Sequence, residues 1–174
     1  MKSQYFMKSL IYTGIFLVIV LTACKNQAES SMEQFRGMYK LDKFETLDST
    51  SGTWGPEPSR EGWSGYIIYD GLGHMAVHLL PGGYKDFDAN KKIDSLSGLE
   101  LNARAKFYAS NYVYFADYSI KDSDVAHHKL TATEPRDWGT MAIRNFEFRG
   151  DTLILKPHEK IGGLIIRLKW VRMK

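Results

Sequence analysis

The sequence predicts an all-β domain, built as an eight-stranded antiparallel up-and-down barrel with one short helix. Eight segments alternate apolar and polar residues with period two, and turn residues separate them, which is the pattern of half-buried strands. The chain is also rich in aromatic residues, with ten Tyr, nine Phe and four Trp, which favour pleated sheet surfaces. No crossover helices alternate with the strands, so a parallel α/β sheet is disfavoured.

The predicted strands follow one another along the chain and are joined mostly by short turns. They cover residues 37–46, 63–70, 74–80, 111–121, 124–133, 141–149, 152–156 and 162–172. Tight turns are expected at Asp70-Gly71-Leu72-Gly73, Asp122-Ser123 and Gly150-Asp151. Irregular loops are expected at 49–61, 81–94 and 134–140. Closing this row of strands into a barrel removes the sheet edges and leaves room for one small ligand, whereas a β-sandwich is the alternative arrangement.

One segment, residues 97–109, has helical rather than strand periodicity. Leu99, Ala103 and Phe107 recur at helical spacing, and Ser95 or Ser97 is available as the N-cap. The segment falls between the third and fourth predicted strands. We expect this helix to cover one mouth of the barrel as a lid.

The N-terminal region predicts export, and the single cysteine predicts a lipid anchor. Lys2 and Lys8 precede an apolar run that is shorter than a membrane span, and small residues then lead to Cys24, which is the layout of a secretory signal. The quartet Leu21-Thr22-Ala23-Cys24 resembles the lipobox of bacterial lipoproteins. The resemblance implies cleavage before Cys24 and acylation of its thiol with chains such as palmitate.

These features divide the chain into a lipoprotein signal peptide at 1–23, an acylated cysteine with a flexible tether at 24–33, and a barrel domain at 34–174. The protein is expected to be exported and lipid-anchored in the cell envelope, as a monomer. Asn26 follows the cysteine by two positions, where many lipoproteins retained at an inner membrane have Asp. The outer membrane is therefore favoured.

Charge and cysteine content argue against several classes of function. Without residues 1–23 the chain has a net charge of 21 − 20 = +1, which gives no electrostatic basis for binding nucleic acid. Acylation of Cys24 leaves no thiol for a disulfide, for catalysis or for a metal. His74 and His78 share a strand face but lie about 13 Å apart, too far to bind one metal ion. Neither a metal nor a cofactor is expected.

Short motifs occur in a fixed order over most of the domain. They are Gly37-Met38-Tyr39, the block 65–77, the strand 114–120, Val125-Ala126-His127 with Pro135, Trp138-Gly139-Thr140 and Arg144, the segment 150–155, and Trp170-Val171-Arg172. Together they resemble the lipocalin-like domain family that is common among bacterial exported proteins, although Tyr39 stands where the family has Trp and Ala116 where Gly is usual. The resemblance implies a barrel with a cavity for a small, largely apolar molecule. Tyr39 leaves open whether the ring-on-arginine contact that closes such barrels is kept. Its cation would be Arg172 or Arg167, and parity favours Arg172 because it shares a face with Trp170.

The resemblance and strand parity together indicate four ligand-binding residues. Tyr114 and Tyr118 are expected to face inward from one strand, and His127 and Arg144 from the next two. We expect these four side chains to hold the polar head, such as a carboxylate, of a small hydrophobic or amphipathic ligand. A buried polar network that binds nothing is the alternative for the same residues.

Two further functions remain open at this point. An acid/base enzyme, of isomerase or cyclase type, could use His127 with Asp117 or Tyr118 in the same cavity. No catalytic residue is assigned to it. A surface interaction module would instead present an exposed aromatic patch formed by the loop tryptophans Trp54, Trp63 and Trp138.

Overall fold

The computed structural model describes residues 32–84 and 91–174; the predicted signal peptide, Cys24 and the tether as far as residue 31 lie outside these ranges. The strands are β1 (Gly37–Leu47), β2 (Trp54–Pro56), β3 (Ser64–Tyr69), β4 (His74–Leu80), β5 (Tyr112–Lys121), β6 (Asp124–Ala132), β7 (Met141–Arg149), β8 (Thr152–Pro157) and β9 (Ile166–Arg172). Helix α2 (Gly98–Ser110) lies between β4 and β5 in the chain. Short 3-10 helices form η1 (Pro58–Arg60), η3 (Ile93–Ser95) and η4 (Pro135–Asp137).

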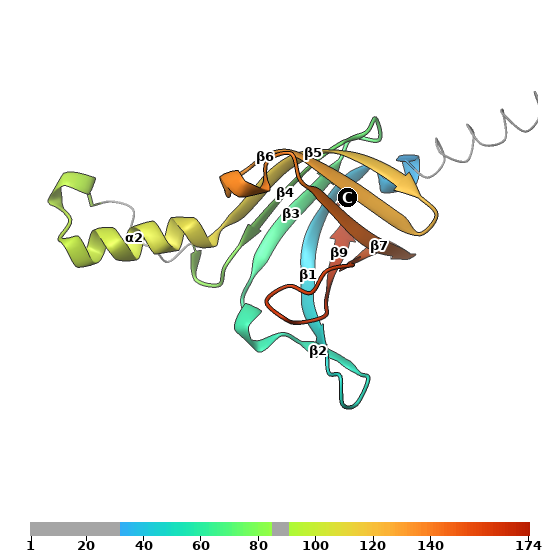
Figure 1. Cartoon of the computed structure of the whole chain (residues 1–174), viewed down its shortest axis with the longest axis horizontal. Coiled ribbons are helices and arrows are strands. Elements are labelled where there is room, and N and C mark those ends of the chain that lie inside the picture. Colours follow the sequence, from blue (N-terminus) through green and yellow to red (C-terminus); the bar gives the residue numbers. More distant parts are fainter. Residues whose placement is uncertain (1–31, 85–90) are drawn as a thin grey trace, which may run out of the picture.

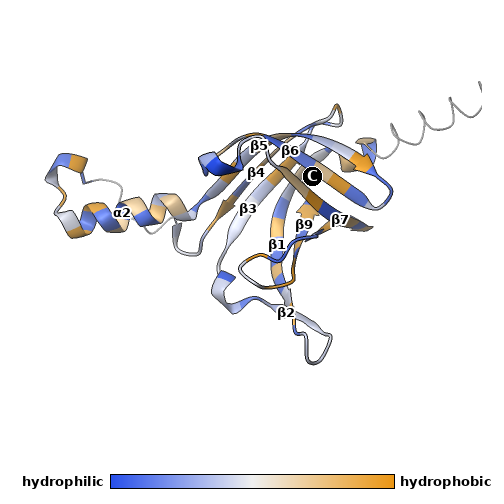
Figure 2. Ribbon diagram, in the orientation of Figure 1, coloured by the Kyte–Doolittle hydropathy of each residue, from blue (hydrophilic) through white to orange (hydrophobic). Residues whose placement is uncertain are grey.

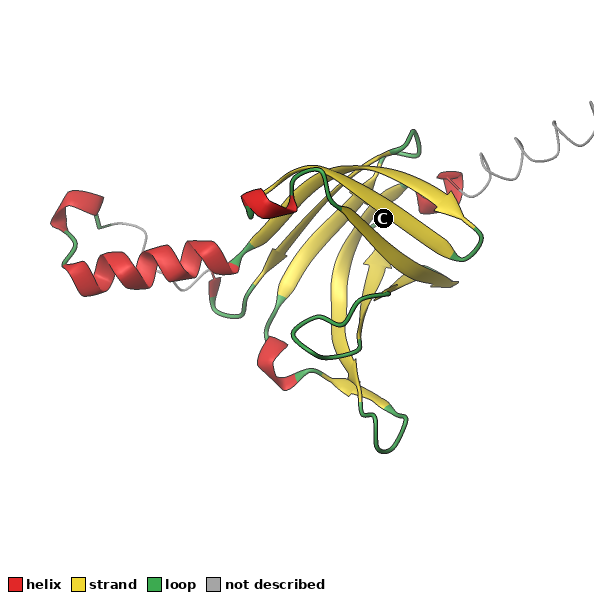
Figure 3. Cartoon of the chain, viewed as in Figure 1, coloured by secondary structure: helices red, strands yellow, loops and turns green. Residues whose placement is uncertain are grey.

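Eight of these strands close into an antiparallel barrel (Figure 1). From β3 to β9 each strand pairs with the next, and β1 pairs with both β3 and β9, which completes the ring. The yellow strands of Figure 3 form this curved wall. Hydrophilic and hydrophobic residues alternate along several strands in Figure 2, because every second side chain faces the interior. The predicted up-and-down barrel is confirmed, and ring closure excludes the sandwich.

Two details of the predicted elements are wrong. The loop 49–61 contains a short strand, β2, which pairs with the end of β1 through Glu45↔Pro56 and Thr46↔Gly55. The last strand begins at Ile166 rather than at Gly162. Gly162 and Gly163 both have positive φ, 59° and 83°, and they form a turn that a bridge between Ile161 and Leu164 closes.

One end of the barrel is closed by the helical residues 32–35. Phe35 is fully buried there, and its ring centroid lies 4.9 Å from those of Tyr69 and Phe146 and 5.1 Å from that of Phe148. The Tyr118 ring lies 6.0 Å away. These rings, from β3, β5 and β7, fill the barrel at this end, which we call the closed end.

Arg172 fixes the N-terminal segment across the closed end. Its guanidinium carbon lies 4.8 Å from the centroid of the Tyr39 ring, so the ring-on-arginine contact is kept, with the arginine that parity favours. The same guanidinium donates to the carbonyl oxygens of Arg36 and, at 2.6 Å, Gln34. Gly37 has a φ of +138°, and a Cβ there would lie 2.8 Å from Arg172 Nη1, so glycine lets the arginine pass.

Helix α2 begins with a capping box. The Ser97 side chain accepts from the backbone of Glu100, and the Glu100 carboxylate accepts from the backbone of Ser97. The helix projects away from the barrel in Figure 1, so the expected lid is wrong. Only its C-terminal end, Tyr108 to Ser110, borders the barrel cavity. Within the described ranges, no helix combines the length and the apolar character needed to span a membrane.

Candidate functional site

The barrel encloses a cavity of about 820 Å³. Its apolar wall comes from inward positions of four strands, at Ile67, Val77, Leu155, Ile166 and Leu168. Arg60, Tyr108, Arg136 and Glu159 line it from the connecting segments at the end opposite Phe35. The wall formed by these four strands is therefore apolar, the open end is polar, and the volume of the cavity suits a small organic molecule.

His127 stands at the centre of a buried hydrogen-bonded chain inside the barrel. Its Nε2 lies 3.0 Å from the Tyr69 hydroxyl, and its Nδ1 lies 2.8 Å from the Tyr114 hydroxyl. Strand β6 supplies the histidine, β3 supplies Tyr69 and β5 supplies Tyr114. All three side chains are buried, and His127 and Tyr114 line the cavity.

Burial keeps this chain neutral. Burial, together with the positive charges of Arg144 and Lys129, lowers the pKa of His127 to about 3. Burial also raises the pKa of Tyr114 to about 12 and the pKa of Tyr69 well above its ordinary value. At neutral pH the imidazole therefore carries one proton and each hydroxyl keeps its own.

A second polar group links β6 to the loop at the open end. Lys129 is buried, and its Nζ donates to the Asp137 carboxylate at 2.9 Å. Tyr112 donates to the same carboxylate oxygen at 2.7 Å. The hydrogen bond from Lys129 lowers the pKa of Asp137, so the lysine charge is compensated where it is buried.

Arg144 lies between the cavity and the loop that follows β8. Its Nη1 donates to Glu159 at 2.8 Å and to the carbonyl of Ile143 at 3.0 Å. The side chain is mostly buried, with 15% of its surface exposed, whereas that of Glu159 is 49% exposed. The arginine thus contributes a cation to the cavity wall and is held by a carboxylate at the rim.

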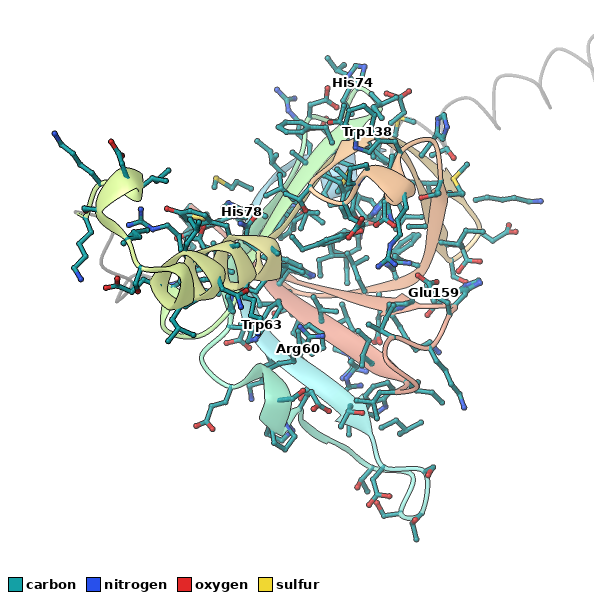
Figure 4. The ribbon with its side chains drawn as sticks, turned by 60° about the vertical axis from the view of Figure 1, so that its left-hand side comes forward. Arg60, Trp63, His74, His78, Trp138 and Glu159 are labelled. Carbon is teal, nitrogen blue, oxygen red and sulfur yellow. The ribbon has the colours of Figure 1, made fainter. Side chains whose placement is uncertain are left out.

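The opposite side of the open end carries an aromatic rim. The guanidinium of Arg60 lies 4.2 Å from the Trp63 ring and 5.4 Å from the Phe44 ring, and all three residues line the cavity. Figure 4 shows Arg60 and Trp63 side by side, away from Glu159. Cation–π contact holds the arginine over the rings.

The structure brings together three of the four residues predicted to bind a ligand. Tyr114, His127 and Arg144 all line the cavity. Tyr118 shares their inward orientation but packs against Phe35 and Tyr69 at the closed end, and it does not line the cavity.

The loop tryptophans have separate surroundings rather than one aromatic patch. Trp54 lies 4.3 Å from the guanidinium of Arg167, and Trp63 belongs to the cavity rim. Trp138 is 55% exposed and donates through Nε1 to the carbonyl of Ala132. An interaction surface that needs all three tryptophans together is not assembled.

The histidines of β4 lie outside the cavity. His74 Nδ1 lies 2.6 Å from the Asp70 carboxylate at the β3–β4 turn, and Figure 4 shows it well separated from His78. Across residues 32–84 and 91–174, no three His, Cys, Asp or Glu side chains gather in a way that could hold a metal ion.

Sequence reasoning missed Tyr69, a buried hydrogen-bond partner of His127, and it missed Lys129 and Trp170, which line the cavity. Alternation on β3 would have placed Tyr69 beside Ile67. Lys129 has the parity of His127 and lies inward with it, just before a bulge at Leu130, where Phe115 pairs with Thr131 and Ala116 with Lys129. The bulge turns Thr131, which also has the parity of His127, to the outside.

Comparison with protein families agrees with this architecture. A family model described as a lipocalin-like domain matches residues 36–167. Among solved structures, a mutant of the fluorescent protein UnaG is similar over 82% of this chain and 98% of its own, at 12% identity and a TM-score of 0.36. No curated protein matches the chain. Because the family model spans the barrel from the start of β1 into β9, the chain belongs to the lipocalin-like domain family.

Proposed function

We propose that the barrel binds a small hydrophobic or amphipathic molecule, with the polar end of that molecule near Tyr114, His127 and Arg144. The observation that carries this proposal is the cavity of about 820 Å³, whose walls are largely apolar and whose polar groups cluster on β5, β6 and β7. Such a cavity offers apolar burial for the body of a ligand and directed hydrogen bonds for its head.

Binding without turnover is favoured over acid/base catalysis. A histidine with a pKa of about 3 is a weak base at neutral pH, and both of its partners are hydroxyl groups. Asp117, suggested as its partner, is exposed on the outer face of β5. No described carboxylate contacts the imidazole by a hydrogen bond, so we propose a carrier or sensor rather than an isomerase or cyclase.

The binding role is tested by native mass spectrometry of the protein purified from its own host. We expect a co-purifying small molecule with wild type, and loss of most of it with Leu168→Trp, because the larger ring fills the cavity beside Leu168. Val171→Trp places the same ring on the outer face of the same strand, where Val171 is 39% exposed. Retention of the ligand by Leu168→Trp, or loss by both variants, contradicts the proposed location.

We further propose that the protein is an exported lipoprotein, anchored by acylated Cys24 and placed at the outer membrane as a monomer. The charged N-terminus, the apolar run and the small residues before Cys24 support this. Two or three acyl chains suffice for stable anchoring. The anchor would hold the cavity next to a source of lipidic ligands.

The anchor is tested on the N-terminal peptide of the mature protein. We expect wild type to yield a peptide that starts at Cys24 and carries acyl chains, measured by mass spectrometry after detergent extraction. Cys24→Ser is expected to abolish both cleavage and acylation, whereas Ser30→Ala in the tether leaves them intact. A mature wild-type chain that still begins at Met1 rules out the lipoprotein assignment.

A further inference from the structure

The hydrogen-bonded chain Tyr69–His127–Tyr114 has three donor hydrogens but only two hydrogen bonds. Neutral imidazole has one N–H, and each tyrosine has one O–H, so three donors share two hydrogen bonds. One hydrogen bond takes the imidazole N–H, and the other takes a hydroxyl hydrogen. The hydrogen of the other hydroxyl must then point to an acceptor outside these three residues. The imidazole tautomer decides which of the two tyrosines carries this uncommitted hydrogen.

The surroundings of the two tyrosines select the tautomer. Tyr69 is 1% exposed, does not line the cavity, and makes its one side-chain hydrogen bond within the described residues to His127. With the proton on Nε2, the Tyr69 hydrogen would be a buried donor without an acceptor. With the proton on Nδ1, Tyr69 donates to Nε2, Nδ1 donates to the Tyr114 oxygen, and the Tyr114 hydrogen faces the cavity.

Trp170 provides a second uncommitted donor on the opposite wall. Its side chain is 1% exposed and lines the cavity from β9, four strands around the ring from β5. Its Nε1 has no hydrogen-bond partner in the described part of the chain. A buried indole N–H normally finds an acceptor, so this donor also calls for one inside the cavity.

Asp137 and Glu159, two of the three carboxylates that line the cavity, are already committed to the protein, and Glu134, the third, lies 3.9 Å from Arg136 in the loop at the open end. Asp137 accepts from Lys129 and Tyr112, and Glu159 accepts from Arg144. Deep in the cavity, donors are therefore in excess over acceptors. A ligand head that has only donors, such as an ammonium group, would find no free carboxylate there.

We infer that the ligand presents a hydrogen-bond-accepting oxygen without a hydrogen of its own, a carbonyl, ester or carboxylate oxygen, to the Tyr114 hydroxyl. Trp170 Nε1 is a second donor to the same molecule. This inference rests on the proposed binding function and adds the chemical class of the head group. It also fixes His127 as a positioning residue, because the imidazole orients the Tyr114 hydroxyl through Nδ1–H.

The tautomer is measurable without any ligand. We expect 15N NMR of the isotopically labelled protein to show the His127 ring protonated at Nδ1 and unprotonated at Nε2 near neutral pH. Protonation at Nε2 would overturn the inference, because Tyr114 would then donate to Nδ1 and the uncommitted hydrogen would belong to Tyr69. The readout is independent of whether the barrel binds anything.

Matched probes test the head group. Decane, decylamine, 2-decanone and decanoate share one apolar body, and their binding is measured by displacement of a fluorescent apolar dye. We expect Tyr114→Phe to weaken binding of 2-decanone or decanoate about five- to tenfold, the loss of one hydrogen bond, and to leave decane and decylamine unchanged. Tyr112→Phe is the matched control, since Tyr112 also lines the cavity but its hydroxyl is committed to Asp137.

The outcomes separate the inference from the proposed function. If decane binds and Tyr114→Phe changes all four probes equally, the head-group inference fails while the cavity still binds. If none of the four probes binds wild type, the proposed function itself fails. Trp170→Phe keeps the His127 chain intact, so a selective loss for oxygen-headed probes in this variant supports the inference even where Tyr114→Phe unfolds.

Discussion

Replacing Phe35 with Ala is expected to lower the free energy of unfolding by about 3–5 kcal/mol. The Phe35 side chain is fully buried at the closed end, between Tyr69, Phe146 and Phe148. The substitution loses the transfer free energy of the ring and leaves a void that these rings fill poorly, because their own strands fix them in the barrel wall.

Urea unfolding, followed by tryptophan fluorescence, measures the effect. Phe115→Ala is the matched control, since Phe115 is 56% exposed on the outer face of β5 and its truncation is expected to cost less than about 1 kcal/mol. A loss below about 1 kcal/mol for Phe35→Ala would show that residues 32–35 do not form part of the folded barrel. The experiment therefore also locates the N-terminal boundary of the domain.

The barrel could be predicted because strand periodicity and turn residues are local signals. The turns at Gly71, Asp122 and Gly150 occur where the sequence placed them, and sequential pairing then follows from short connections. β2 could not be predicted in the same way. Three residues are too short for periodicity, and pairing with β1 depends on the path of the whole loop.

Parity predicts the face of a side chain but not its depth in the barrel. Tyr114 and Tyr118 share the inward face of β5, and four residues of strand separate them by about 13 Å. This distance places Tyr114 beside the cavity and Tyr118 at the closed end. The bulge at Leu130 likewise changes parity without a sequence signal, which is why Thr131 lies on the outer face although it has the parity of His127 and Lys129.

Helix α2 also has one feature that local sequence determines and one that tertiary packing determines. Ser97 and Glu100 form the capping box that starts α2, and both are visible in the sequence. The direction of the helix depends on packing instead. Leu99, expected on its apolar face, is 84% exposed, so local periodicity did not bring that face onto the barrel.

Acidification is expected to destabilise the fold through His127 before the carboxylates are protonated. The pKa of His127 falls from its ordinary value of 6.5 to about 3 in the folded state, because burial disfavours the imidazolium. A depressed folded pKa means that the unfolded chain binds the proton first, so stability is complete above pH 6.5 and is lost as pH falls toward 3. Between pH 7 and pH 5 the loss is about 2 kcal/mol.

His127→Gln should remove most of this pH dependence, because glutamine is neutral throughout the range. The measurement is urea unfolding of wild type and variant at pH 7, 6 and 5. Ion pairing and hydrogen bonding keep the pKa values of Asp137 and Glu45 below their ordinary values, so these carboxylates stay charged throughout this window. His74→Gln is the control of opposite sign: its hydrogen bond to Asp70 raises the pKa of His74, so that pair stabilises the fold at lower pH. Parallel pH curves for wild type and His127→Gln would mean that the imidazole is accessible to protonation in the folded barrel, and the neutral chain from Tyr69 to Tyr114 would then be wrong.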